Sequence, residues 1–314
     1  MKKKSHVTWI CIGLVLSIIG AMFQWLIMND FGRAEHKQLK IMTESGYELS
    51  MDAYIPKTAT ADNPAPTIVV MHGGNDDKDT MVKYPIELVR RGYVVVNVDM
   101  YSHGRSEDLP DSKWLTAGRG FYDAVRNVVT WPFVDTDRLS MLGYSRGGKS
   151  AGEALALDNE TLNVVKSIFL VYSDPIYTNE NGYTDVYGPR DIAVVADCYD
   201  EFFFTEKMED TSNYSNDTNK FMRTLTSPLD YLEHNSAQSF LHFGVDPTGL
   251  EKRAERTVYE KTYEDGRVGT REITMIKEVH TSGQYSTECL EVMLDFYERA
   301  LPAPVKVDGT INIP

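Results

Sequence analysis

Cysteine is scarce in this sequence, and the cysteines present are far apart. The 314 residues include three, at Cys11, Cys198 and Cys289, and none of them forms the Cys-x-x-Cys spacing typical of zinc and redox sites. Histidine and cysteine also form no cluster with metal-ligand spacing. We therefore expect no metal site. Cys198 and Cys289 could pair in an oxidising compartment, but sequence spacing does not measure their separation, so this question stays open.

Basic residues are few relative to acidic ones. Lysine and arginine total 32 against 46 aspartates and glutamates, so the formal net charge is −14 at pH 7. A nucleic-acid partner requires a basic surface, and the chain has no Lys/Arg stripe with interleaved aromatic residues. We therefore exclude nucleic acid as a partner. The 42% apolar content is sufficient for the core of a large globular domain.

One uncharged run of unusual length stands near the N-terminus. It extends over residues 7–28, and as a helix it would span about 33 Å, enough to cross a bilayer. A cleaved signal peptide is the alternative, with Ala21 near the cut, but the apolar run continues well past Ala21. The lysines at positions 2 to 4 favour a cytoplasmic N-terminus. We therefore expect a single-pass protein of the cell membrane, with residues 1–6 as a basic cytoplasmic tail and its main domain outside the cytoplasm.

After a stalk predicted at 29–38, strand patterns alternate with helix patterns. Continuous apolar runs, rather than alternating ones, are typical of strands buried on both faces of a mostly parallel sheet. The pattern predicts an α/β domain over 39–302 and a C-terminal tail over 303–314. The expected strands are two within 39–56 and one each at 67–74, 93–100, 138–143, 164–173, 239–246 and 270–279; the expected helices are 81–92, 113–131, 147–157, 244–264 and 286–300.

The alternation stops for about sixty residues after the strand at 164–173. A loop of this length inside a compact domain is usually a lid or an inserted cap, which we place at 174–237. Residues 174–238 contain 13 acidic against 4 basic residues and six tyrosines. The segment is either a substrate-shaping cap or a solvated insertion with a few core anchors.

The stretch "LSMLGYSRGGKS" places Ser145 between Gly143 and Gly147. If the preceding residues form a strand and the following ones a helix, Ser145 lies on a strained reversal where neighbouring side chains would collide. Such a turn exposes the serine hydroxyl at the edge of a sheet. Ser145 is the candidate nucleophile, although a glycine-rich turn with an incidental serine has the same pattern.

A serine nucleophile requires a base within hydrogen-bond reach and an acid that orients the base. His280 directly follows a predicted strand, and Asp246 follows the strand before it. Ser145, Asp246 and His280 thus occur in the chain order of an α/β hydrolase. Asp174 is the alternative acid because it also follows a strand, and His103 is a candidate pocket residue.

The transition state of acyl transfer requires two backbone donors for its oxyanion. The stretch "HGGN" follows an earlier strand and supplies one donor, from Gly74 or from Asn75. The main-chain N–H of Arg146, directly after the serine, supplies the other. His72, Asn75 and Tyr144 complete the predicted pocket.

From about 39 to 300 the sequence resembles the α/β hydrolases, and "VDTDRLSMLGYSRGG" is similar to the nucleophile region of the dienelactone hydrolase, acetyl esterase and prolyl oligopeptidase-like branch. The resemblance implies an α/β-hydrolase fold and hydrolysis of an ester, or less often an amide, through an acyl-enzyme without a cofactor. It implies the same roles for Ser145, His280, Asp246, Gly74 and Arg146.

Three functions remain open at this point. The first is an esterase acting on small acyl esters or acylated carbohydrates, for which the tyrosines of the cap could stack on sugars. The second is a peptidase or amidase whose acidic cap selects a cationic substrate. The third is a hydrolase-like module kept for binding. Oligomeric state does not follow from the sequence.

Overall fold

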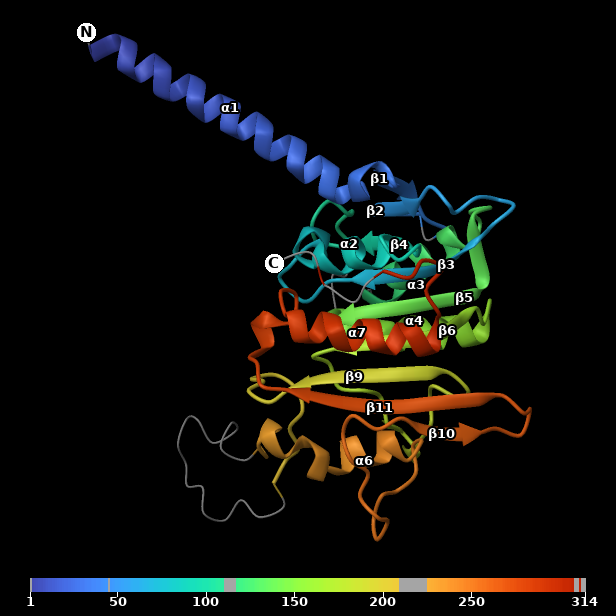
Figure 1. Cartoon of the computed structure of the whole chain (residues 1–314). Helices are drawn as coiled ribbons and strands as arrows, with labels where there is room; N and C mark the ends of the chain where they lie inside the picture. The colour runs from blue at the N-terminus through green and yellow to red at the C-terminus, as the bar shows by residue number, and fades with distance from the viewer. Residues whose placement is uncertain (1, 45, 110–116, 209–224, 308–310, 312–314) are drawn as a thin grey trace.

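The structure is a computed structural model that describes residues 2–44, 46–109, 117–208, 225–307 and 311. Within this part of the chain, a nine-stranded sheet has the order β1-β2-β4-β3-β5-β6-β9-β11-β10 (Figure 1). The strands from β4 to β11 pair in parallel, whereas β1, β2 and β10 pair antiparallel. Their bounds are β1 Ala34–Met42, β2 Glu48–Pro56, β3 Ala65–Met71, β4 Val94–Val98, β5 Val134–Tyr144, β6 Val165–Val171, β9 Asp191–Asp197, β10 Tyr259–Thr262 and β11 Val268–Ile276.

Helices cover both faces of the sheet. α3 and α4 pack against each other, and α7 packs on β6, β9 and β11. Tyr84 on α2 donates a hydrogen bond to Cys289 on α7 at 3.3 Å, so these two helices share a face. The helices are α1 Lys2–Met28, α2 Lys83–Val89, α3 Ala117–Val128, α4 Arg146–Glu160, α6 Asn235–Leu241 and α7 Thr287–Ala300, with 3₁₀ turns η1 Asp30–Gly32, η2 Lys78–Met81, η4 Pro228–Glu233 and η5 His280–Ser282.

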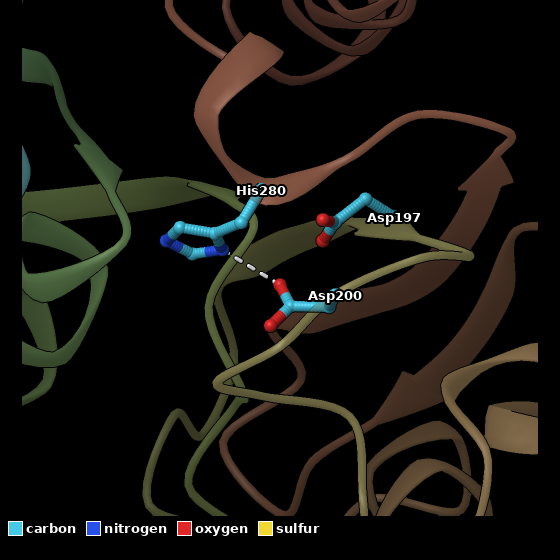
Figure 2. A group of neighbouring side chains, drawn as sticks. All are labelled: Asp197, Asp200 and His280. Carbon is cyan, nitrogen blue, oxygen red and sulfur yellow. Dashed lines mark hydrogen bonds and ion pairs between the residues drawn. The ribbon is translucent and has the colours of Figure 1, made fainter.

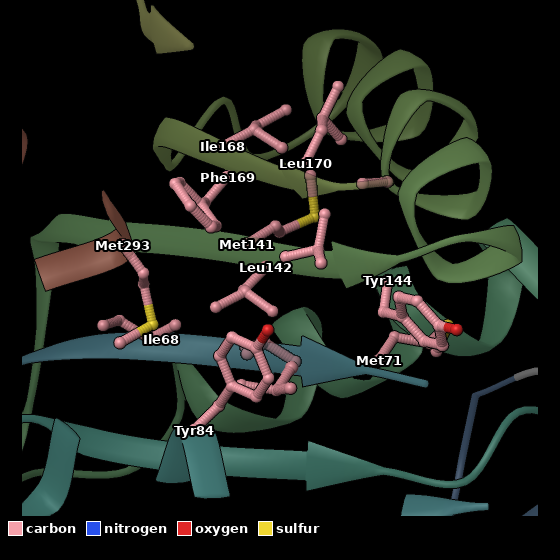
Figure 3. Close-up of a cluster of buried hydrophobic side chains, with 14 of the residues drawn as sticks. Ile68, Met71, Tyr84, Met141, Leu142, Tyr144, Ile168, Phe169, Leu170 and Met293 are labelled. Atoms are coloured by element: carbon pink, nitrogen blue, oxygen red, sulfur yellow. The ribbon is translucent and has the colours of Figure 1, made fainter. Parts of the chain in front are cut away.

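The core lies on both sides of the central strands. All residues of β3 and β4 are buried, in agreement with their continuous apolar sequences. Figure 3 shows side chains of β5 and β6, among them Met141 and Phe169, packed together with Met293 of α7. This rigid centre carries the loops at the carboxyl ends of the parallel strands.

Most of the predicted elements are confirmed. The two N-terminal strands, the strands β3 to β6 and β11, and the helices α2, α3, α4 and α7 lie where their patterns placed them. The fold is that of an α/β hydrolase with a mostly parallel sheet, as predicted.

The cap prediction over 174–237 is wrong at its start. Residues Asp191–Asp197 form β9, which lies between β6 and β11 in the middle of the sheet. Only the short hairpin of β7 (Thr178–Asn179) and β8 (Gly182–Tyr183) precedes it. The main insertion therefore begins after β9. Residues 209–224 of the predicted cap lie outside the described residues.

Two further elements differ from prediction. The stretch expected as a strand at 239–246 belongs instead to α6 and the turn after it, because its apolar residues pack as a short helix against β11. The helix expected over 244–264 is wrong too, since this segment is irregular until the edge strand β10. Short apolar runs are compatible with either secondary structure, and packing decides between them.

The apolar N-terminal run forms the helix α1, which projects from the domain (Figure 1). Residues His6–Met28 are long and apolar enough to cross a membrane, and an 18-residue apolar window in this stretch has no buried residue. Met28 at its end is half-buried against the domain core. The predicted stalk at 29–38 is wrong. Asn29 and Asp30 are buried and β1 begins at Ala34, so α1 is joined to the sheet without a spacer.

The three cysteines are unpaired. Cys198 and Cys289 are buried and Cys11 is exposed on α1. The domain thus needs no disulfide to close its core.

Candidate active site

Ser145 occupies a strained turn between β5 and α4. Its φ of 54° and ψ of −117° lie in a region that residues other than glycine rarely adopt. A Cβ atom at Gly143 would come within 2.3 Å of the Gly147 carbonyl oxygen, and one at Gly147 within 2.4 Å of the Met71 carbonyl oxygen. These glycines are required because backbone segments approach one another here. The geometry confirms the predicted turn.

His280 lies within hydrogen-bond reach of Ser145, as the sequence predicted. Its Nε2 is 2.7 Å from Ser145 Oγ, and its Nδ1 is 2.7 Å from Asp200 Oδ2. The imidazole stacks with the rings of Tyr144 and Phe203, with centroids at 5.6 and 5.4 Å. Tyr144 also donates a hydrogen bond to the His280 carbonyl oxygen. The ring is therefore held by aromatic contacts and by a partner at each nitrogen.

The acid beside His280 is Asp200, and the prediction of Asp246 is wrong. Asp246 is exposed after α6, where its carboxylate accepts a hydrogen bond from the Thr248 N–H. The alternative, Asp174, is also not beside His280, since it accepts a hydrogen bond from the Phe204 N–H. Burial raises the pKa of Asp174 to about 6. Both candidates thus serve local structure.

The error follows from the missed strand β9. Asp200 follows β9, which is the parallel neighbour of β11, the strand that precedes His280. Its sequence, "DIAVVAD", is a β-branched apolar run bounded by aspartates and could have been recognised as a buried strand. The strand was not predicted because it lies inside a long acidic segment that was interpreted as a single insertion.

The carboxylate of Asp200 is held by several donors. Burial opposes its ionisation, but hydrogen bonds from His280 and from the N–H groups of Phe202 and Phe203 outweigh this and lower its pKa. The two backbone bonds reach Oδ1, at 2.5 and 2.6 Å. Oδ2 remains directed at the imidazole. Asp200 is thus ionised and oriented toward Nδ1–H.

A cavity of about 590 Å³ opens over Ser145. Five of the predicted residues line this cavity: Gly74, Asn75, Tyr144, Arg146 and His280. Six further lining residues were not predicted: Asp76, Lys149, Phe202, Phe203, Thr281 and Gln284. Gly74 and Arg146 are neighbours, because a Cβ on Gly74 would lie 3.6 Å from Arg146 Cδ. The two predicted oxyanion donors therefore belong to one wall of the cavity beside Ser145.

His72 and His103 are not among the described residues that line this cavity. His72 is fully buried, and its Nε2 accepts a hydrogen bond from the Met100 N–H, which leaves Nδ1–H to donate to the Gly73 carbonyl. Burial lowers the pKa of His72 to about 4, so it is neutral. His103 packs against it with ring centroids 5.5 Å apart. Both histidines thus belong to the structure around the loop after β3 and not to the cavity wall.

Cationic and aromatic side chains surround the nucleophile. Lys149 lies one turn after Ser145 on α4, and its Nζ is 4.8 Å from the centroid of the Phe203 ring. Asp76 is the carboxylate of the wall, and burial raises its pKa. The five tyrosines that the structure describes in the predicted cap do not line the cavity, so its aromatic surface is provided by Tyr144 and the two phenylalanines.

Asp197, Asp200 and His280 bring three potential ligand atoms within 4.8 Å of one another. Both ring nitrogens of His280 already have hydrogen-bond partners in Ser145 and Asp200. The hydrogen bonds of His280 to Ser145 and Asp200 account for its position, and we assign no metal to the arrangement.

A family model for X-Pro dipeptidyl-peptidases of the S15 family matches residues 45–237, more than half of the chain. The chain belongs to this family. The S15 match agrees with the resemblance to α/β hydrolases stated from the nucleophile region. No curated protein matches the sequence.

Three solved structures are similar to this S15-family chain, and two of them, with TM-scores above 0.5, share its fold. A hypothetical protein from Pseudomonas aeruginosa, PA2218, is 13% identical, covers 86% of this chain and 94% of its own, and has a TM-score of 0.56. DcsB, solved with a substrate analogue, is 12% identical over 85% of this chain and 100% of its own, with a TM-score of 0.53. Est1E from Butyrivibrio proteoclasticus, solved with ferulic acid, is 17% identical over 52% and 80%, with a TM-score of 0.43.

At these identities the structural neighbours show the fold alone. The S15 family match supports a serine hydrolase of the α/β-hydrolase type. The bond that is cleaved has to be inferred from the site.

Proposed function

We propose that this protein is a serine hydrolase that cleaves carboxylic esters, with Ser145 as nucleophile, His280 as base and Asp200 as acid. The observation that carries the proposal is the continuous chain of two 2.7 Å hydrogen bonds from Ser145 through His280 to Asp200. It opens on a cavity large enough for a small acyl ester. The cavity contains no other serine among the described residues that line it.

The steps follow from the positions of these groups. Ser145 Oγ attacks the acyl carbon while its proton passes to His280 Nε2, and the backbone N–H groups of Gly74 and Arg146 stabilise the oxyanion. Asp200 stabilises the imidazolium that forms. The leaving alcohol then takes the proton from Nε2. Water attacks the acyl-enzyme by the same route, which releases the acid and restores Ser145.

The charges of the described cavity wall favour an ester over a peptide with a free amino terminus. Lys149 and Arg146 lie on the first turn of α4, next to the nucleophile. A substrate ammonium group would be repelled by them. An uncharged ester has no such penalty, and its acyl group can pack against Phe202 and Phe203.

The second candidate is a dipeptidyl peptidase, and the S15 family match favours it. Such an enzyme must bind the terminal ammonium group of its substrate. Asp76 is the one carboxylate among the described residues that line the cavity, and it would serve that purpose. An Asp76→Asn variant separates the candidates, because it should raise KM for aminoacyl substrates and leave KM for neutral esters nearly constant.

Labelling with a fluorophosphonate probe tests the proposal. The full chain in detergent should become covalently labelled at Ser145, and Ser145→Ala should not be labelled. A panel of nitrophenyl acyl esters and X-Pro nitroanilides should then show the higher kcat/KM for the esters. An unlabelled wild-type chain would instead indicate a binding module, and faster cleavage of the X-Pro substrates would indicate a peptidase.

We also propose that α1 anchors the protein in the cell membrane with its catalytic domain outside the cytoplasm. The length and exposed apolar surface of α1 and the lysines before it support this proposal. The full chain should remain in the membrane pellet after alkaline extraction, and protease added outside the cell should digest the domain. A soluble protein that begins near Met22 would show cleavage of a signal peptide instead.

A further inference from the structure

A second carboxyl group, that of Asp197, lies behind the acid of the proposed triad. Asp197 is the last residue of β9 and has no exposed surface. Neither of its carboxyl oxygens accepts a hydrogen bond from any described residue, and no salt bridge to it occurs in the described part of the chain. An ionised carboxylate is strongly disfavoured in such a place.

Figure 2 shows the carboxyl group of Asp197 next to the hydrogen-bonded pair of Asp200 and His280. One oxygen from each aspartate and a ring nitrogen of His280 lie within 4.8 Å of one another. Two carboxylates so close cannot both be ionised at low cost, so one of them holds a proton. Asp200 already accepts hydrogen bonds from His280 and from two backbone N–H groups, which favour its charged form.

The proton therefore belongs to Asp197. Burial, followed by the neighbouring Asp200, raises the pKa of Asp197 well above its usual range. Asp200 shows the opposite direction. The two environments separate the ionisation of two adjacent carboxyl groups, which is the pattern of an acid and a base with different tasks.

We propose that Asp197 is a positioning residue: a neutral carboxylic acid that donates a hydrogen bond to the carboxylate of Asp200. This inference rests on the proposed function, since it concerns the acid of that triad. The bond adds a donor to Asp200 and fixes the direction of Oδ2 toward His280. It also limits the negative charge behind the imidazole to that of a single carboxylate, which sets how strongly the imidazolium is stabilised.

The ionisable groups around the two side chains are few. Those acting on Asp197 are Asp200, Glu201, Cys198, Tyr144 of β5 and Cys289 of α7. Those facing His280 are Asp200, Asp76, Tyr144 and Tyr172. Lys149 and Arg146 line the same cavity as His280. In the described residues, however, the salt bridge of Asp200 is with His280 and Asp197 has none, so no cation is paired with a second negative charge at Asp197.

The test is the pH profile of kcat/KM on a chromogenic ester, whose acid limb reports protonation of the base. Asp197→Asn keeps a neutral donor of the same size, so the midpoint of the acid limb should stay within about 0.3 pH units. Were Asp197 ionised, the substitution would remove a negative charge near the imidazole and move the midpoint to lower pH by about one unit or more. That result would overturn the proposal.

Asp197→Ala removes the donor. Asp200 then attracts the imidazolium more strongly, so the midpoint should move to higher pH and kcat should fall about tenfold or more, because the carboxylate is less well oriented. The Asn variant should restore both. A midpoint that does not move in Asp197→Ala would reduce Asp197 to a structural residue and overturn the proposal.

Infrared spectroscopy provides a readout that does not depend on activity. At about pH 8 the folded protein should show the carbonyl stretch of a protonated carboxyl group, sensitive to D₂O, and Asp197→Asn should lack it. Its absence from the wild type would contradict the inference. A chain that shows the band but hydrolyses no ester and is not labelled would instead contradict the proposed function.

Discussion

Replacing Ser145 by alanine should lower kcat on a chromogenic ester by about 10⁴-fold or more. Without Oγ no acyl-enzyme can form, and only substrate binding and the oxyanion donors remain. His280→Ala should have a comparable effect, because the base is 2.7 Å from Oγ and acts only through it. The double variant should be little worse than either single one, since the two residues act as a unit.

Ser150→Ala is the matched control for this measurement. Ser150 lies on the same helix, and its hydroxyl donates to the Arg146 carbonyl oxygen instead of facing the cavity. Alanine is well tolerated in a helix, so kcat should stay within about threefold of the wild type. If Ser145→Ala kept most of its activity while remaining folded, the acyl-enzyme mechanism would be refuted.

The second large effect is expected at Asp200. In Asp200→Asn the amide can still accept the bonds from Phe202 and Phe203, but it no longer stabilises the imidazolium or holds Nδ1–H in the required tautomer. We expect kcat to fall by up to about 10⁴-fold with KM nearly constant. Steady-state kinetics on the same ester measure both values.

Asp246→Asn is the chemically identical control at an exposed site, and kcat should stay within about twofold. Asp174→Asn should also be mild in kcat, since its carboxylate binds the Phe204 N–H. A large loss at Asp246 with a small one at Asp200 would return the acid role to the loop after α6 and contradict the geometry described above.

Several features of this protein could be predicted from local sequence because local chemistry determines them. Ser145 was found because only glycine fits at Gly143 and Gly147, where a Cβ would meet backbone at 2.3 and 2.4 Å. The buried strands were found because burial on both faces requires continuous apolar runs. His280 was found because it directly follows such a strand. Each of these requirements restricts the residue types at neighbouring positions, so it can be recognised in the sequence.

Which carboxylate lies beside His280 depends on the sheet order. β9 pairs with β6 and β11, strands that stand about 20 and 70 residues away in the chain, so its place in the sheet is decided by long-range pairing. Asp200 reaches His280 only through that pairing, whereas Asp246 follows a segment that packs as α6.

The sequence by itself determined the fold class, the apolar N-terminal helix, the strained turn of Ser145 and the place of His280 after a buried strand, because backbone sterics and apolar periodicity act over a few residues. Only the tertiary structure decided the acid, the buried Asp197 behind it and the phenylalanines beside the imidazole. These depend on which strands become neighbours and on which carboxyl groups are removed from water together. Such proximity sets charge and orientation through distance in space, which separation along the chain does not measure.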